Sequence, residues 1–245
     1  MLSLAGQRAS GAARRLVDPV LAVVFPSRCP ACAHSLRRPL SGPLCEACWA
    51  LLPTRSLALC PCSASGERRC PRCRRGLNPL GRGLSLGRHE GPLRLLVHEL
   101  KYRGKRVVAA RLAEQFLARA DVRALLEPDC LLVPVPLHPR RRRQRGFNQS
   151  ELMARELARR CGRRLAAEVL ARRTDTPPQT GLSAAARRAN LKDAFLVRRR
   201  GALAGRVVVL VDDVLTTGAT ARACAAALRA AGAREVRVLT AARVL

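Results

Sequence analysis

Five consecutive aliphatic residues, 207–211, stand directly before two acids, Asp212 and Asp213. A continuous apolar run rich in β-branched side chains predicts a strand buried on both faces, in the middle of a parallel sheet. Because a dry strand cannot hold charged carboxylates, we expect the acids at its carboxyl end. Open α/β sheets bind their ligands at that edge, so this stretch predicts the position of a site.

Other apolar periodicities predict the elements around that strand. Helical spacing predicts helices over about 93–101, 107–120 and 218–231, and one that begins near residue 150. Apolar runs predict strands at 131–139, 194–197 and 235–242, the first of which enters a turn stiffened by prolines. The glycine-rich stretch 74–91 predicts a loop. Strands that alternate with helices predict an α/β fold with a mostly parallel sheet.

The ends of these patterns divide the chain into three predicted parts. Residues 1–26 contain arginines and an apolar run that Asp18 and Pro19 interrupt, without a small-residue cleavage site after it. No stretch approaches the length of a membrane span. We therefore expect an amphipathic segment at 1–26, a small cysteine-rich module at 27–80 and the main domain at 81–245, in a cytoplasmic protein.

The loop after the two acids has the composition of a phosphate site. Threonine hydroxyls, a glycine and the free N–H groups of a helix start together attract one phosphate. The residues are Thr216, Thr217, Gly218, Ala219 and Thr220. Carboxylates beside an anion site fit a ribose 5-phosphate, whose hydroxyls donate to the acids. No lysine follows the glycine as a P-loop requires. The alternative is a buried strand before a capped helix, with no ligand.

The charge of the chain is extreme, with 46 Lys+Arg against 17 Asp+Glu and a formal net charge of +29. Nearly all of the excess is arginine. Two explanations stay open: a coding bias toward arginine, or attraction to a polyanion such as nucleic acid. An aromatic content of 2% weakens the second, because single-strand binders stack bases on exposed rings.

Eight of the eleven cysteines lie between residues 29 and 73. In a cytosolic chain, paired spacings of this kind indicate a metal site rather than disulfides. Cys29, Cys32, Cys45 and Cys48 form two C-x-x-C pairs that can close on a structural Zn²⁺. Reduced core cysteines and an iron–sulfur cluster are the alternatives. A second set has one short spacing and predicts a second zinc site: Cys60, Cys62, Cys70 and Cys73.

Basic segments elsewhere suit a pyrophosphate group, which accepts paired hydrogen bonds from guanidinium groups. Arg145 lies in the arginine-rich segment after the strand at 131–139, and Lys101 lies at the end of the first helix. Each is also compatible with a solvated turn. The polar stretch 171–195, with Arg187 and Asn190, predicts either a loop that closes over a substrate or an ordinary surface loop.

The strand, its two acids and Thr-Thr-Gly-x-Thr resemble the signature of type I phosphoribosyltransferases, and the whole chain from Cys29 onward resembles the ComF family. The motifs that carry the family resemblance are the paired cysteines, His98 with Lys101 and Tyr102, Val-Pro-Val-Pro at 133–136, Arg-x-Arg-Gly-Phe-Asn-Gln at 143–149, Thr-x-x-Gln-Thr-x-Leu-Ser at 176–183, and Arg187 with Asn190. The C-x-C spacing of Cys60 and Cys62 departs from the C-x-x-C usual in that family.

The resemblance implies a double zinc ribbon joined to a phosphoribosyltransferase domain, with a role in DNA uptake, DNA repair or nucleotide metabolism. It implies that the chain displaces pyrophosphate from phosphoribosyl pyrophosphate in the presence of Mg²⁺, with Asp212 and Asp213 as catalytic residues that hold the ribose hydroxyls. Residues 216–220 would bind the 5′-phosphate, and four polar residues the remaining ligand: Lys101, Arg145, Arg187 and Asn190.

A competing hypothesis is that the chain has this fold but does not catalyse the reaction. The chain would then be a sensor of a phosphoribosyl ligand, or an adaptor that binds nucleic acid in the DNA-uptake machinery. The expected partners are phosphoribosyl pyrophosphate and, under the second hypothesis, single-stranded DNA or other competence and DNA-processing proteins. No residue of the sequence stands out as a base for an acceptor substrate, so the acceptor is not predicted.

Overall fold

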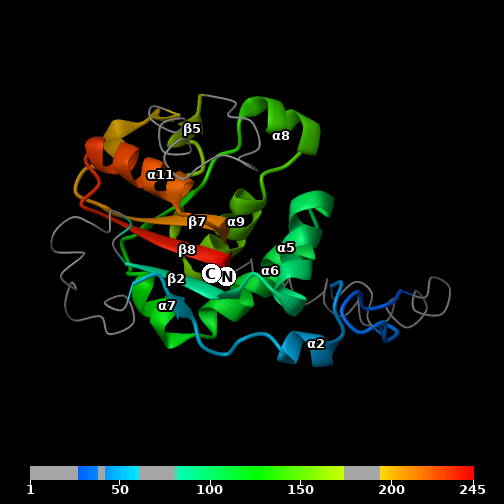
Figure 1. Ribbon diagram of the computed structural model, residues 1–245. Coiled ribbons are helices and arrows are strands. Elements are labelled where there is room, and N and C mark those ends of the chain that lie inside the picture. The colour runs from blue at the N-terminus through cyan, green and yellow to red at the C-terminus, as the bar shows by residue number, and fades with distance from the viewer. Residues whose placement is uncertain (1–26, 38–41, 61–79, 81, 174–193) are drawn as a thin grey trace, which may run out of the picture.

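The structure is a computed structural model that describes residues 27–37, 42–60, 80, 82–173 and 194–245 (Figure 1). The predicted amphipathic segment at 1–26 lies outside the described residues, as do five of the predicted site residues. Those five are Cys62, Cys70, Cys73, Arg187 and Asn190.

A six-stranded sheet forms the centre of the main domain, with the strand order β1-β2-β8-β7-β3-β4. The strands are β1 (Leu57–Ala58), β2 (Gly83–Arg88), β3 (Leu131–Pro134), β4 (Arg164–Leu165), β7 (Val207–Leu215) and β8 (Glu235–Arg243). All neighbours run parallel except β1 and β2. The predicted α/β fold with a mostly parallel sheet is confirmed, and the aliphatic run at 207–211 lies in β7 between two parallel neighbours.

Alternate side chains of β7 enter two different cores. Val207, Val209 and Val211 pack with four helices: α5 (Gly91–Arg103), α6 (Arg106–Leu117), α7 (Ala120–Leu125) and α9 (Gln149–Cys161). Val208 and Leu210 pack with α11 (Ala219–Ala230) and with the hairpin of β5 (Leu170–Arg172) and β6 (Phe195–Val197), which η2 (Arg200–Ala202) follows. Figure 1 shows α11 on one side of the sheet and α7 on the other. The sheet is therefore the middle of three layers.

The loop predicted at 74–91 is wrong over 83–88, where β2 pairs with β8. Its glycines misled the prediction because they mark close packing inside a strand, not a turn. A Cβ at Gly83 would overlap Leu59, and one at Gly87 would lie 2.7 Å from the Cγ of Pro53.

Two helix predictions also need correction. The helix predicted at 107–120 divides into α6 and α7, because Arg119 leaves the helical conformation and its guanidinium donates to the carbonyls of Leu86 (2.9 Å) and Pro53. The turn predicted after β3 contains a short helix, α8 (Pro139–Arg145). Its start has a signal in the sequence: a proline at the first position and His138 as N-cap, whose Nδ1 accepts from the N–H of Arg140 at 3.3 Å.

The cysteine-rich segment docks on α6 through α2 (Glu46–Ala50). The Arg111 guanidinium of α6 lies 4.4 Å from the Trp49 ring centroid and donates to both carboxylate oxygens of Glu46, at 3.0 and 3.1 Å. Beyond α2, strand β1 extends the sheet edge. The division of the chain after residue 80 stays a prediction. Across the described ranges, no helix is long and apolar enough to cross a membrane.

Candidate functional site

Asp212 and Asp213 lie within β7, not after it, because the strand continues to Leu215 and Asp212 pairs in register with Thr240 of β8. Both acids are buried, at 9% and 7% exposed. Burial, and then the neighbouring charge of Asp213, raise the pKa of the Asp212 carboxyl well above its usual 3.8. Burial of this carboxyl therefore disfavours its charged form, since an isolated buried charge is costly.

A hydrogen-bond network fixes the two carboxyl groups. The Ser150 hydroxyl at the start of α9 donates to Asp212 Oδ1 at 2.9 Å, and the backbone N–H of Asp213 donates to the same oxygen at 2.9 Å. Asn148 caps α9 by accepting from the N–H of Ser150 at 3.0 Å, and its Nδ2 donates to the Val135 carbonyl beyond β3 at 3.0 Å. Sequence reasoning missed Ser150, although the Asn-x-Ser pair before an apolar helix is an N-cap signal.

The threonine loop joins β7 to α11 as predicted. Gly218 has the left-handed φ of 72° and is the N-cap residue of α11. Thr216 and Thr217 are exposed, and Thr217 Oγ1 accepts from the N–H of Ala219 at 3.4 Å. Exposed hydroxyls therefore surround the positive end of a twelve-residue helix, an arrangement that favours an anion.

The predicted pyrophosphate-binding cations Lys101 and Arg145 lie at one aromatic ring. The Lys101 ammonium is 5.6 Å and the Arg145 guanidinium 5.8 Å from the Tyr102 ring centroid. These three residues, with Arg141 and Gln144, line an open cavity of about 500 Å³. The structure thus brings together two basic segments that are far apart in the sequence.

Contact between Gly104 and Phe147 holds those segments together. Gly104 ends α5 with a left-handed φ of 58°, and a Cβ there would lie 2.6 Å from the Phe147 ring. Such close approach is open only to glycine. It fixes the end of α5, which carries Lys101, against the segment that follows Arg145.

His89 also belongs to this edge of the sheet, and sequence reasoning missed it because its strand was predicted to be a loop. It follows β2 directly, and its N–H donates to the Arg243 carbonyl of β8 at 2.8 Å. Burial is the main influence that lowers the pKa of its imidazole below 6.5. The charges that act on its ring come from Arg94, Asp213 and Lys101.

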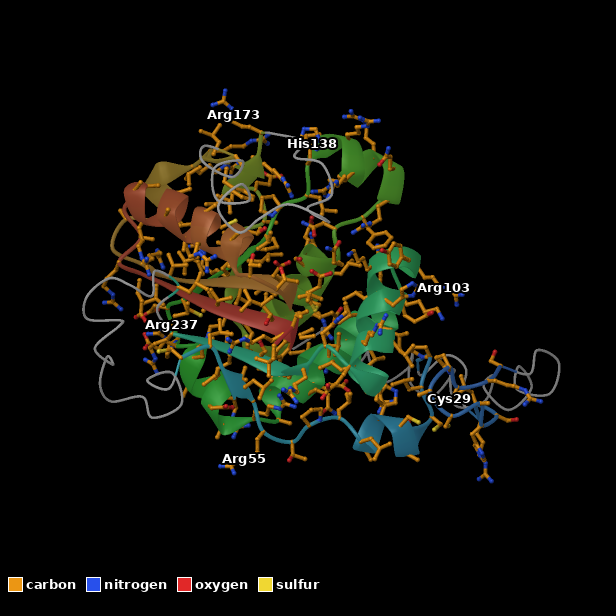
Figure 2. All side chains as sticks on the ribbon, viewed as in Figure 1. Cys29, Arg55, Arg103, His138, Arg173 and Arg237 are labelled. Atoms are coloured by element: carbon orange, nitrogen blue, oxygen red, sulfur yellow. The ribbon has the colours of Figure 1, made fainter. Side chains whose placement is uncertain are left out.

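Four of the predicted metal-binding cysteines lie together. The sulfur atoms of Cys29 (labelled in Figure 2), Cys32, Cys45 and Cys48 are all within 4.8 Å of one another. Tetrahedral Zn²⁺ with Zn–S bonds of about 2.3 Å holds sulfurs roughly 3.8 Å apart. The Cys32 and Cys45 sulfurs are 3.6 Å apart, so the cluster fits a structural metal. Cys60 is buried and stays a predicted ligand, because its expected partners lie outside the described residues.

The electrostatics of this cluster also fit a cation. Burial raises the pKa of the Cys29 thiol, but backbone N–H groups of Cys45, Ala31 and Cys32 outweigh it and bring the value to about 7. For Cys48, burial and then the surrounding thiols raise the pKa. Four thiolates at this spacing need a positive ion to be stable together.

Comparisons with known proteins show a family and relatives that cover most of the chain. Residues 144–244 match the family described as phosphoribosyl transferase domain. The chain is 37% identical over 222 residues to DNA utilization protein YhgH of Salmonella typhimurium, over 89% of this chain and 90% of that protein. It is 36% identical over 180 residues to the protein of that name from Escherichia coli K12, over 72% of this chain and 78% of that protein. It is 31% identical over 223 residues to competence protein F of Haemophilus influenzae, over 87% and 96% of the two chains.

The cysteine cluster generates a first prediction. Protein purified without added metal should contain Zn²⁺, and Cys45→Ser should contain about one Zn²⁺ fewer per chain, because the fourth thiolate closes the tetrahedron. A strong chelator should lower the melting temperature, since a module this small cannot fold on its own core. Elemental analysis and melting curves measure both. Cys161→Ser, outside the cluster, is the control and should keep its metal. Zinc-free protein with melting insensitive to chelator would contradict the assignment.

The buried acid generates a second prediction. Because the pKa of Asp212 is raised in the folded state, its contribution to stability is fully present below 3.8 and is lost as pH rises through the folded pKa. Asp212→Asn should therefore raise the free energy of unfolding near neutral pH by about 1–3 kcal/mol and change it little at low pH. Denaturant melts across pH, without ligand, measure this. The exposed acid Asp129, changed to Asn, is the control; an equal gain at every pH would refute the prediction.

Proposed function

Because the chain belongs to the ComF family, with DNA utilization protein YhgH and competence protein F among its relatives, we propose that it binds phosphoribosyl pyrophosphate with Mg²⁺. One observation carries this proposal. A buried acid pair on β7 stands directly before exposed threonines at the start of α11. That pairing of carboxyl groups with an anion site suits a sugar phosphate, which offers hydroxyl donors and anionic oxygens within one molecule.

In this proposal Asp212 and Asp213 accept hydrogen bonds from the 2′- and 3′-hydroxyls of the ribose. The hydrogen bond from Ser150 keeps the Asp212 carboxyl in place before the ligand arrives, which lowers the cost of ordering it. Residues 216–220 receive the 5′-phosphate on their hydroxyls and on the free N–H groups of α11. Both contacts come from one continuous segment, so their spacing is fixed by the strand and the helix.

The pyrophosphate group would then lie toward Lys101 and Arg145. Their shared position at the Tyr102 ring and the open cavity beside it support this placement. Arg187 and Asn190 complete the proposed ligand set, and the support for these two residues is their sequence motif. Bound Mg²⁺ would neutralise part of the pyrophosphate charge.

The reaction served by such a site is glycosyl transfer. The bond between C1 of the ribose and pyrophosphate breaks, its electron pair leaves with pyrophosphate, and an acceptor forms the new bond to C1. Lys101 and Arg145 stabilise the charge that develops on the leaving group, and the acid pair holds the sugar in position. We propose that the chain is a phosphoribosyltransferase on this basis.

A role in DNA uptake or DNA use and a structural Zn²⁺ at the four cysteines belong to the same proposal. The names of the relatives support the first, and the donor set of Cys29, Cys32, Cys45 and Cys48 supports the second. A cytoplasmic location is also part of the proposal, and it is supported by cysteines that are spaced as metal ligands and form no disulfides among the described residues. The proposed parts of the chain are 1–26, 27–80 and 81–245.

A second candidate function is nucleic-acid binding without transfer, for which Tyr102 is the supporting observation. Its side chain is 59% exposed and has Lys101 and Arg145 beside the ring. An exposed ring between cations is suited to a stacked base with phosphates on either side. Helix α8 adds arginines, and no residue of that helix is buried.

The acid pair generates the third prediction. Asp212→Asn combined with Asp213→Asn should weaken binding of phosphoribosyl pyrophosphate in Mg²⁺ by at least about tenfold, because the loss of a charge-assisted hydrogen bond to Asp213 alone removes about 1.5–3 kcal/mol. Calorimetric titration with matched melting curves measures this. Asp129→Asn, which removes one carboxylate at an exposed position, is the control. Equal affinity of the double variant and the unchanged protein would remove the acids from the site.

The exposed tyrosine generates the fourth prediction. If single-stranded DNA binds here, Tyr102→Ala should weaken binding by roughly 5- to 100-fold, since a stacked base contributes about 1–3 kcal/mol. The salt slope should change little, because phosphate contacts set it. Tyr102→Phe keeps the ring and should bind normally. Fluorescence anisotropy over a salt series tests both variants, and full binding by Tyr102→Ala would leave this face without a role in stacking.

A further inference from the structure

Gln149 is the first residue of helix α9 and is 5% exposed, yet the proposed function gives it no part. Its side-chain Oε1 accepts a hydrogen bond from the guanidinium of Arg145 at 2.9 Å. The same guanidinium lies 5.8 Å from the Tyr102 ring centroid, at the open cavity of about 500 Å³ that Arg145 and Lys101 line. A buried amide therefore holds one of the two cations that are proposed to bind pyrophosphate.

The backbone of Gln149 is fixed by its neighbours in sequence. Asn148 caps α9 by accepting from the N–H of Ser150 at 3.0 Å, and the Ser150 hydroxyl donates to Asp212 at 2.9 Å. Gln149 lies between these two anchored residues, so its side chain starts from a fixed position. The amide can thus orient Arg145 before a ligand arrives, which lowers the cost of ordering the guanidinium.

The partner of Arg145 differs in charge from the partners of nearby arginines. On the same short helix, α8, the Arg142 guanidinium forms an ion pair with Glu151 at 3.1 Å, and Glu151 also pairs with Arg155 at 3.0 Å. Gln149 instead offers a neutral oxygen, and among the described residues Arg145 forms no ion pair. A guanidinium held by an amide keeps its charge and its other N–H donors for an anion.

We propose that Gln149 is a positioning residue of the pyrophosphate site, which orients the Arg145 guanidinium at the cavity without neutralising it. This inference rests on the proposed function. It gives the start of α9 two tasks, because Ser150 holds the acid Asp212 and Gln149 holds the cation Arg145. One helix terminus thus sets the spacing between the groups proposed for the ribose and for the leaving group.

A double-mutant cycle on the full chain tests this, with magnesium pyrophosphate as the probe in calorimetric titrations. Gln149→Ala should weaken binding by about fivefold to tenfold, because the guanidinium is no longer held. Arg145→Ala should weaken it at least as much, and adding Gln149→Ala to it should cost nothing further, since the amide acts only through Arg145. Full affinity in Gln149→Ala, or losses that multiply in the double variant, would overturn the inference.

Gln149→Glu separates positioning from a purely structural role. A carboxylate of the same shape still accepts from Arg145, so the melting temperature should not fall, but it neutralises the guanidinium and should weaken pyrophosphate binding about tenfold. Gln115→Glu adds the same charge on α6, outside the cavity, and is the matched control that should bind as the unchanged protein does. A structural role alone would leave Gln149→Glu with full affinity, and that result would refute the proposal.

A measurement without ligand distinguishes failure of this inference from failure of the proposed function. Tyr102 is the single tyrosine of the chain, so its ring signals in NMR report the guanidinium beside it. Gln149→Ala should shift those signals in the same direction as Arg145→Ala does. If only Arg145→Ala shifts them, Gln149 does not position Arg145, even where the ligand binds. If the unchanged protein binds neither magnesium pyrophosphate nor phosphoribosyl pyrophosphate, the proposed function itself is wrong.

Discussion

The burial of two acids at the end of a central strand is the constraint on which the site depends. β7 has neighbours on both edges and cores on both faces, so its carboxyl groups cannot turn to water without breaking the strand. Their environment solves this locally. Ser150 and the backbone N–H of Asp213 both donate to one oxygen of Asp212, and burial raises the pKa of that carboxyl. The N-terminus of α9 must therefore lie beside the end of β7.

The position of α9 also determines where the opposite wall of the site lies. Asn148 caps α9 and its amide donates to the Val135 carbonyl. These two bonds tie the start of α9 to the end of β3 and hold both ends of the segment between them. Phe147, in that segment, packs against Gly104, where no Cβ fits. The position of α9 therefore also fixes Arg145 relative to Lys101. Cations at the rim and acids at the strand end are thus parts of one arrangement, although they come from four separate elements.

Sequence patterns predicted those parts of the site in which function and local structure use the same residues. The aliphatic run of β7, the glycine at the start of α11 and the cysteine pairs each have a local signature, and the structure has them where expected. His89 and Ser150 have none. Their positions at this end of the sheet arise because β2 lies next to β8 and α9 beside β7, and such pairings depend on distant parts of the chain. The glycines inside β2 led to the prediction of a loop, because glycine is favoured both in turns and where elements pack closely.

Several acids among the described residues lie in ion pairs with arginine or lysine. With 46 Lys+Arg against 17 Asp+Glu, an acid finds a cation easily, and Glu99, Glu151 and buried Arg237 all lie in such pairs. Within the described ranges, neither Asp212 nor Asp213 forms an ion pair with any arginine or lysine. A carboxylate committed to arginine has its lone pairs occupied and binds a sugar hydroxyl poorly. A carboxyl group without such a partner among the described residues keeps its oxygens available as acceptors for a ligand.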